Sequence, residues 1–216
     1  MNERPIIFSG EMARAILDGR KTQTRRVVKP QPKVVHGWNG DWLQTNQIFR
    51  SSKPGLLCPY GKAGDRLWVR ESFLGWKSPI LGLGDVVYQG EPEYDKCLAD
   101  VPYVKKVQEK NPGKVGNWAN IPSIHMPRWA SRITLEITNV RVERLQSITQ
   151  SDIRQEGGTD HSQQAANLGT KDAEYLLDYN WFSNAWNKIN GKTHPWSSNP
   201  FVWVIDFKVI KRPDNN

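Results

Sequence analysis

Two long strand patterns in the second half of the chain constrain its fold most strongly. Residues 132–145 (RITLEITNVRVERL) alternate apolar and polar side chains, and a change of phase at Thr138-Asn139 predicts a bulge or a turn. Residues 201–210 (FVWVIDFKVI) begin with apolar side chains on both faces, a pattern typical of a strand inside a sheet. The sequence therefore predicts a sheet that includes the last strand of the chain.

A third strand pattern, DRLWVRESF at 65–73, contains one anomaly. Leu67, Val69 and Phe73 share one face, and the other face carries Arg66, Trp68, Arg70 and Ser72. Glu71 falls on the apolar face, where a carboxylate is costly unless it is neutralised or paired. Two interpretations remain open: Glu71 lines a pocket with a cation such as Lys21, or the strand ends at Arg70 and Glu71 is exposed.

The remaining elements are shorter. Residues 5–9 predict a strand, followed by a helix that Ser9 caps and Gly19 ends. Thr149 and Asp152 resemble a helix-capping pair, and 171–190 predicts a longer helix with Phe182, Trp186 and Ile189 on one face. No alternation of strands and helices suggests a parallel sheet. We expect an α+β fold: one domain over 1–216, a small, mixed, partly open β-barrel flanked by helices, with loop insertions at about 29–64 and 75–130.

The net charge of +8 is concentrated in one third of the 216 residues. Residues 1–70 hold 13 Lys and Arg against 5 Asp and Glu, whereas residues 71–216 hold 17 of each. A one-sided positive charge favours a phosphate-bearing partner, although an ordinary solvated basic surface would look the same. Cys58 and Cys97 form no CxxC, and the four histidines lack metal-ligand spacing. We expect no metal, no cofactor, no membrane partner and a cytoplasmic location.

Much of that charge lies in GRKTQTRR, residues 19–26. Lys21 and Thr24 can form a base and a nucleophile if burial lowers the pKa of the lysine, with a carboxylate such as Glu71 orienting it. Alternatively, Lys21 only binds phosphate. Arg25 and Arg26 suit phosphate or carboxylate, or form a solvated pair.

A second candidate set follows in HMPRWASR, residues 125–132. Arg128, Trp129 and Arg132 combine two cations with an aromatic ring, which suits base stacking and phosphate binding. A packed tryptophan with two arginines extending to the surface is the alternative.

The pattern Gly19, Lys21 and Arg26 resembles the ASCH family motif Gly-x-Lys-x-x-Glu-x-Arg, with Thr24 in place of the glutamate. The resemblance implies a PUA-like barrel. The bacterial branch that hydrolyses N4-acetylcytidine also has lysine and threonine at these places, and a later glutamate completes its site. By this resemblance Thr24 is the nucleophile, Lys21 the base and Glu71 the third member.

Four blocks in order, covering about half of the chain, are similar to larger ASCH-type proteins of bacteriophages and prophages: the first 30 residues, GDRLWVRESF, MPRWASRITLEITNVRVERL and NPFVWVIDF. The amidohydrolases of the family lack the two insertions. Three functions therefore stay open: amide hydrolysis of an N-acylated nucleoside without a metal, binding of RNA (more than DNA) or its metal-independent cleavage, and a non-catalytic phage accessory role. The protein partner and the oligomeric state stay open too.

Overall fold

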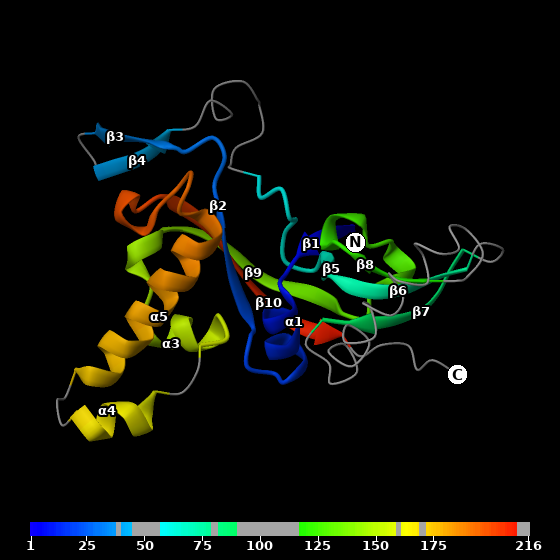
Figure 1. Cartoon of the computed structure of the whole chain (residues 1–216). Coiled ribbons are helices and arrows are strands. Elements are labelled where there is room, and N and C mark those ends of the chain that lie inside the picture. Colours follow the sequence, from blue (N-terminus) through cyan, green and yellow to red (C-terminus); the bar gives the residue numbers. More distant parts are fainter. Residues whose placement is uncertain are drawn as a thin grey trace. The chain divides into compact units, whose positions relative to one another are not determined.

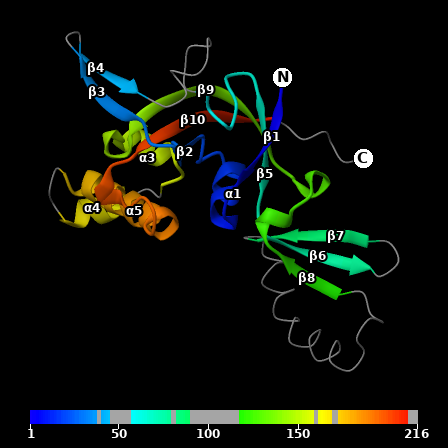
Figure 2. The same cartoon turned by 90° about the horizontal axis from the view of Figure 1, so that it is seen from above.

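A computed structural model describes residues 1–37, 40–44, 57–78, 82–89, 117–158, 161–168 and 172–210. Its elements are shown in Figures 1 and 2. In chain order they are β1 (Glu3–Ile7), α1 (Gly10–Leu17), β2 (Gln23–Val27), β3 (Lys33–Gly37), β4 (Gly40–Gln44), β5 (Arg66–Arg70), β6 (Phe73–Ser78), β7 (Gly82–Tyr88), β8 (Asn117–Ile121), η1 (Ser123–His125), η2 (Arg128–Ala130), β9 (Thr134–Arg144), η3 (Leu145–Ser147), α3 (Gln150–Gln155), α4 (Ser162–Leu168), α5 (Ala173–Asn190), η4 (Trp196–Ser198) and β10 (Phe201–Ile210).

These elements confirm the α+β class, and the sheets are open in the part of the chain that the structure describes. Five strands form a mixed sheet in the order β1-β5-β9-β10-β2, in which β1 runs parallel to β5 and β10 antiparallel to β2. A three-stranded antiparallel sheet has the order β7-β6-β8, and β3 pairs with β4. None of the described helices is long and apolar enough to cross a membrane.

The chain divides into two compact units. Unit 1 comprises Met1–Asn2, Gly19–Asp65 and Glu136–Lys208, and unit 2 comprises Glu3–Asp18, Arg66–Leu135 and Val209–Asn216. Unit 1 therefore contains β2, β3, β4 and most of β9 and β10, with helices α3 to α5. Unit 2 contains α1, the parallel pair β1–β5 and the β7-β6-β8 sheet.

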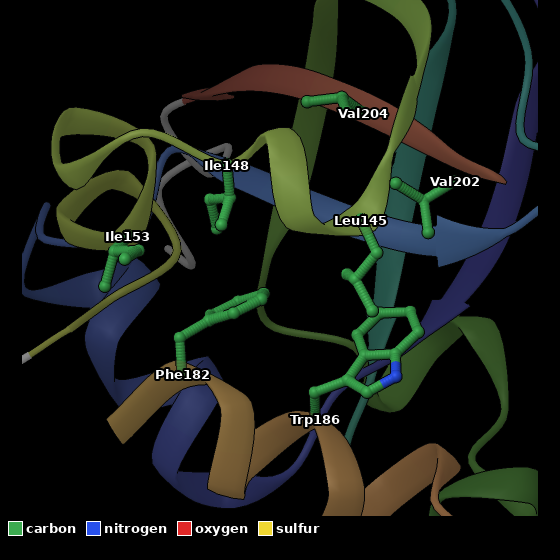
Figure 3. Close-up of a cluster of buried hydrophobic side chains, with 7 residues drawn as sticks. All are labelled: Leu145, Ile148, Ile153, Phe182, Trp186, Val202 and Val204. Carbon is green, nitrogen blue, oxygen red and sulfur yellow. The ribbon is translucent and has the colours of Figure 1, made fainter. Parts of the chain in front are cut away.

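The core of unit 1 joins α5 to the strands. Phe182 and Trp186, one helical turn apart on α5, pack with five aliphatic side chains that come from η3, α3, β10 and the segment between η3 and α3 (Figure 3): Leu145, Ile148, Ile153, Val202 and Val204. Ile189 lies outside this cluster and is 58% exposed, so the sequence expectation for this residue is wrong. The apolar stripe ends one turn earlier because the last turn of α5 faces solvent.

Unit 2 confirms the two faces of the 65–73 pattern. Leu67 and Val69 on β5 are buried. The residues that alternate with them, Arg66, Trp68 and Arg70, are only half-buried. A smaller cluster of Phe73, Met126 and Ala130 supports the β6 end of this unit.

Most expected elements occur where the sequence places them. Ser9 caps α1 by accepting a hydrogen bond from the Met12 amide (3.3 Å), and Gly19 follows with φ of +76°, a conformation that favours glycine. The phase change at Thr138-Asn139 occurs within one continuous strand, β9, so it is not a turn. The proposed insertions are more regular than expected, because β3 and β4 lie within 29–64 and β7 and β8 within 75–130. Cys97 and its polar surroundings, residues 90–116, are outside the described residues.

The expected capping pair before α3 gives a direct test. The Thr149 hydroxyl accepts a hydrogen bond from the Asp152 amide (3.2 Å), and the Asp152 carboxylate accepts one from the Thr149 amide (3.0 Å). Thr149→Ala should lower the free energy of unfolding by about 0.5–2 kcal/mol in urea denaturation, because it removes the cap. Thr149→Ser keeps the hydroxyl and should retain most of the stability; equal losses in both variants would contradict this role.

Candidate functional site

Strand β2 carries the centre of the GRKTQTRR motif and presents it on two faces. Its register against β10 pairs Thr24 with Ile205 and Arg25 with Val204. Successive side chains of a strand point to opposite faces, so Gln23 and Arg25 share one face and Thr24 and Arg26 the other. Gln23, Thr24 and Arg25 are all buried. The second half of the motif, residues 23–26, is therefore a regular strand where the sequence alone suggested a loop or an irregular strand.

Lys21 precedes β2 and is buried against the end of α3. Its side chain is 1% exposed, and its Nζ donates hydrogen bonds to the Glu156 carbonyl (2.8 Å) and to Glu156 Oε2 (2.7 Å). A backbone bridge between the same two residues fixes this arrangement. Burial lowers the pKa of Lys21, the carboxylate of Glu156 opposes this effect, and the net shift is downward from 10.5. The amine is thus easier to deprotonate than that of an exposed lysine.

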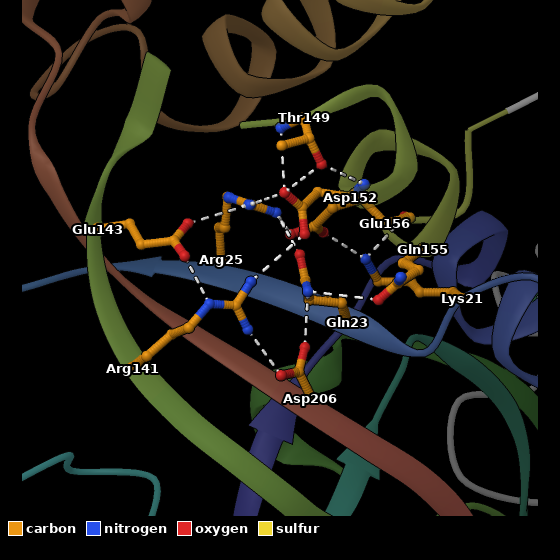
Figure 4. Close-up of polar contacts among 10 residues, drawn as sticks. All are labelled: Lys21, Gln23, Arg25, Arg141, Glu143, Thr149, Asp152, Gln155, Glu156 and Asp206. Carbon is orange, nitrogen blue, oxygen red and sulfur yellow. Dashed lines mark hydrogen bonds and ion pairs between the residues drawn. The ribbon is translucent and has the colours of Figure 1, made fainter. Parts of the chain in front are cut away.

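Arg25 lies in the same network but is held by acidic groups (Figure 4). Its guanidinium nitrogens lie 3.3 Å from Glu156 Oε1, 3.3 Å from Asp152 Oδ2 and 3.5 Å from Glu143 Oε2. Burial raises the pKa of Asp152, but the hydrogen bonds from Thr149 and the charge of Arg25 outweigh it, and the net shift is downward. These carboxylates meet the charge of Arg25, which also lines the pocket beside β2.

Two further side chains extend the network across the sheet. Arg141 on β9 donates to Asp206 Oδ2 (2.7 Å) and Asp152 Oδ1 (3.3 Å), and it also pairs with Glu143. Gln23 donates to Asp206 Oδ1 (2.6 Å) and accepts a hydrogen bond from Arg25. The network therefore joins β2, β9, β10 and α3 and holds the backbone of the motif in place.

Glu156 is a site residue that the sequence interpretation missed. It directly follows α3 and precedes Gly157-Gly158, a glycine pair that favours a helix end. A charge argument could have pointed to it, since a buried Lys21 needs a carboxylate and this acidic residue lies beside a strong helix stop. Nothing in the spacing of 135 residues, however, indicates the pairing.

Glu71 is buried in unit 2, so the interpretation that it is exposed is excluded. Its carboxylate accepts hydrogen bonds from Arg132 Nε (2.9 Å) and Nη2 (3.0 Å), and it is 1% exposed. The guanidinium of Arg132 also lies over the Tyr88 ring, 4.0 Å from its centroid. Arg132 therefore serves as the bidentate partner of Glu71 and is itself buried, whereas the sequence suggested a nucleic-acid contact.

Arg128 and Trp129, from the same segment, are exposed. Trp129 is 58% exposed, and Arg128 pairs with Glu3 on β1 at 2.8 and 3.0 Å. The guanidinium groups of Arg128 and Arg70 lie 5.9 and 5.5 Å from the Trp68 ring centroid. We call Arg66, Trp68, Arg70, Arg128 and Trp129 the arginine–tryptophan face of unit 2.

A pocket of about 260 Å³ opens in unit 1 beside the C-terminal half of β2. Arg26 and Lys29 line it, together with Tyr60 and the turn after α5 that contains Thr193 and His194. No aspartate or glutamate is among the described lining residues. Over the described ranges, no three His, Cys, Asp or Glu side chains gather closely enough to hold a metal ion.

No protein-family model matches the chain, and no curated protein matches it in sequence. Among solved structures, it is similar to the high-resolution crystal structure of an ASCH domain from Lactobacillus crispatus JV V101. The TM-score is 0.40 and the sequence identity 12%, over 96% of this chain and 79% of that chain.

Proposed function

We propose that this chain is an ASCH-type protein that acts on a nucleoside or RNA, and that its reaction is hydrolysis of the amide of an N-acylated nucleoside such as N4-acetylcytidine. The observation that carries the proposal is the buried Lys21 amine with its lowered pKa, three residues before a buried Thr24. A lysine with a lowered pKa is the base that a hydroxyl nucleophile needs when no histidine is present. The Gly19, Lys21, Thr24 and Arg26 pattern adds the family resemblance.

In this mechanism Thr24 Oγ1 attacks the acyl carbon while the Lys21 amine accepts the hydroxyl proton. The proton passes to the leaving amine, which departs as cytidine and leaves the acyl group on Thr24. Water then hydrolyses that ester and regenerates the hydroxyl. Arg26 shares the strand face of Thr24, which supports a role for it in binding the substrate or the developing oxyanion.

Two carboxylates are candidates for the third role. Glu71 is the one that the family resemblance assigns. Glu156 is the one that Lys21 contacts, at 2.7 Å, and transfer of a proton from Lys21 to Glu156 would leave both groups neutral and free the amine to act as a base. Glu71→Gln and Glu156→Gln separate these roles, since only the carboxylate that exchanges the proton should change the pH dependence of kcat.

The basic experiment follows cytidine release when the purified protein is incubated with N4-acetylcytidine. We expect steady turnover that persists in EDTA, with acetate formed in equal amount. A protein that is folded by circular dichroism and yet releases no cytidine at millimolar substrate contradicts the proposal.

A second candidate function, RNA binding, is favoured by the arginine–tryptophan face. Half-buried Trp68 lies beside the guanidinium groups of Arg70 and Arg128, and Trp129 is largely exposed. Exposed rings beside cations suit single-stranded nucleic acid, because bases stack on the rings and phosphates pair with the arginines. The positive charge of residues 1–70 would add attraction at low salt.

This candidate predicts that Trp129→Ala weakens binding of a 12-nucleotide single-stranded RNA about 5- to 100-fold, the cost of one lost stacking contact. Arg70→Gln should weaken binding and make it less dependent on salt, since one phosphate contact is lost. Fluorescence anisotropy at several salt concentrations measures both effects, with DNA of the same sequence alongside. Lys188→Gln removes the same charge from an exposed site on α5 and serves as the control; equal effects at positions 70 and 188 would exclude a specific face.

A further inference from the structure

The pocket beside β2 differs in charge from the acidic network, although the two share Arg25. Arg25 and Arg141 in the network are each surrounded by carboxylates. The described lining of the pocket adds the cations Arg26 and Lys29 and several uncharged donors, and it contains no aspartate or glutamate. Such a concentration of donors and positive charge without acidic groups is suited to an anion.

The lining also has a fixed geometry on one side. After α5, the amides of Thr193 and His194 donate to the Asn190 carbonyl at 3.0 and 2.8 Å. The His194 carbonyl accepts a hydrogen bond from Trp186 Nε1 (2.8 Å), which ties this turn to the core of unit 1. The backbone of this turn is therefore fixed beside the pocket, and the Thr193 hydroxyl lies 3.5 Å from the Asn190 carbonyl and 3.1 Å from His194 Nδ1. The turn would need little ordering on binding.

The lowered pKa of Arg26 also favours an anion in this pocket. Burial lowers the pKa of Arg26, Tyr60 and Glu156 partly offset that effect, and the net shift is downward. An anion in the pocket would stabilise the charged guanidinium and return part of the free energy lost by its desolvation.

We propose that this pocket binds the phosphate group of a phosphorylated small ligand, with Arg26 and Lys29 supplying charge and the hydroxyls of Tyr60 and Thr193 donating hydrogen bonds. A phosphate dianion suits two cations and several donors better than a carboxylate, which carries one charge and two oxygens. A volume of about 260 Å³ accommodates a phosphate with part of an attached sugar. Only the choice of cytidine for the probes rests on the proposed function; the phosphate site itself does not.

The test measures binding by isothermal titration calorimetry at low salt, with no turnover required. Cytidine 5′-monophosphate should bind at least about tenfold more tightly than cytidine, because charge-assisted hydrogen bonds to the phosphate are added. Inorganic phosphate should compete with the monophosphate, and acetate at the same ionic strength should not. Equal affinity for nucleoside and nucleotide, or equal competition by acetate, would overturn the proposal.

Variants locate the binding to this pocket. Arg26→Gln should raise the Kd for cytidine 5′-monophosphate about tenfold or more, and Lys29→Gln about two- to fivefold because Lys29 is exposed. Lys62→Gln removes an exposed charge from the same 57–65 segment outside the pocket lining and should leave the Kd unchanged.

If Arg26→Gln does not fold, the combined Lys29→Gln and Thr193→Ala variant decides the question, since both side chains are exposed. Unchanged nucleotide affinity in that folded variant would overturn the proposal. Nucleotide binding by the wild-type protein without any hydrolysis of N4-acetylcytidine would instead count against the amidohydrolase alone.

Discussion

Glu156→Ala should lower the free energy of unfolding by about 3–5 kcal/mol at pH 7, because it removes one partner of a buried ion pair. The side chains of Lys21 and Glu156 are 1% and 7% exposed, and Glu156 also meets the buried Arg25 at 3.3 Å. Without this carboxylate, the Lys21 amine keeps its hydrogen bond to the backbone carbonyl of residue 156 but loses its opposite charge there. Urea denaturation followed by circular dichroism measures the loss.

Two further variants test whether this loss of stability arises from an uncompensated buried charge. Replacing both partners, Lys21→Met with Glu156→Leu, should recover much of the stability, since well-packed apolar side chains often replace a buried pair at little cost. Arg154→Ala near the end of α3 breaks an exposed pair with Glu174 (2.6 Å) and a long contact with Asp178 (3.9 Å). Because Asp178 keeps its contacts with Gln150 and His161, this variant should cost about 0–1 kcal/mol. Similar losses in Glu156→Ala and Arg154→Ala would contradict the role assigned to Glu156.

The loss of stability in Glu156→Ala should become smaller as the pH rises. The pKa of Lys21 is lower in the folded protein than its ordinary value of 10.5. Between these two pKa values the unfolded chain binds more protons, so this group makes stability rise with pH. Removing Glu156 removes an interaction that raises the pKa, which widens this range downward. The stability difference between Glu156→Ala and the wild type should therefore shrink as the pH approaches 10.

Lys21→Met should reduce kcat for N4-acetylcytidine by about 10²–10⁴, the usual contribution of a general base. Lys21→Arg is the matched variant, because arginine keeps the positive charge but does not lose its proton at accessible pH. It should be as inactive as Lys21→Met if the lysine acts as a base. Full activity of Lys21→Arg would show that residue 21 contributes only charge.

The nucleophile has its own matched pair. Thr24→Ser keeps a hydroxyl and should retain measurable turnover, whereas Thr24→Val is close in shape and should lose it. The double variant Lys21→Met/Thr24→Val should be little worse than Thr24→Val alone, because a base and its nucleophile act as one unit. Additive losses would indicate that the two residues act separately and would contradict their proposed roles as base and nucleophile.

Local patterns predicted most of the fold. The alternation in β5 correctly separated buried Leu67 and Val69 from Trp68, and the closing strand β10 spans the residues expected. The Thr149–Asp152 cap was found because its geometry depends on residues three apart. The prediction failed at Ile189, since helical spacing identifies a stripe but not the residue at which the stripe leaves the core.

The candidate site depended on contacts that no local pattern encodes. The sequence identified Lys21, Thr24, Arg26 and Glu71 as chemically notable, and burial of Lys21 and Glu71 agrees with that emphasis. It did not show that Arg25 is held by acidic residues of β9 and the α3 region, nor that Arg25 and Arg26 both line one pocket. Arg25 and Arg26 are adjacent and chemically identical, so the sequence alone does not tell them apart.

By itself, then, the sequence determined the strands β1, β5, β9 and β10, the helix caps at Ser9 and Thr149 and the concentration of positive charge, because each follows from residues close together in the chain. Only the tertiary structure decided that Lys21 pairs with Glu156 and Glu71 with Arg132, over separations of 135 and 61 residues. The physical reason is that a buried charge requires an opposite charge nearby in space, and the chain fold alone selects which of many carboxylates or arginines supplies it.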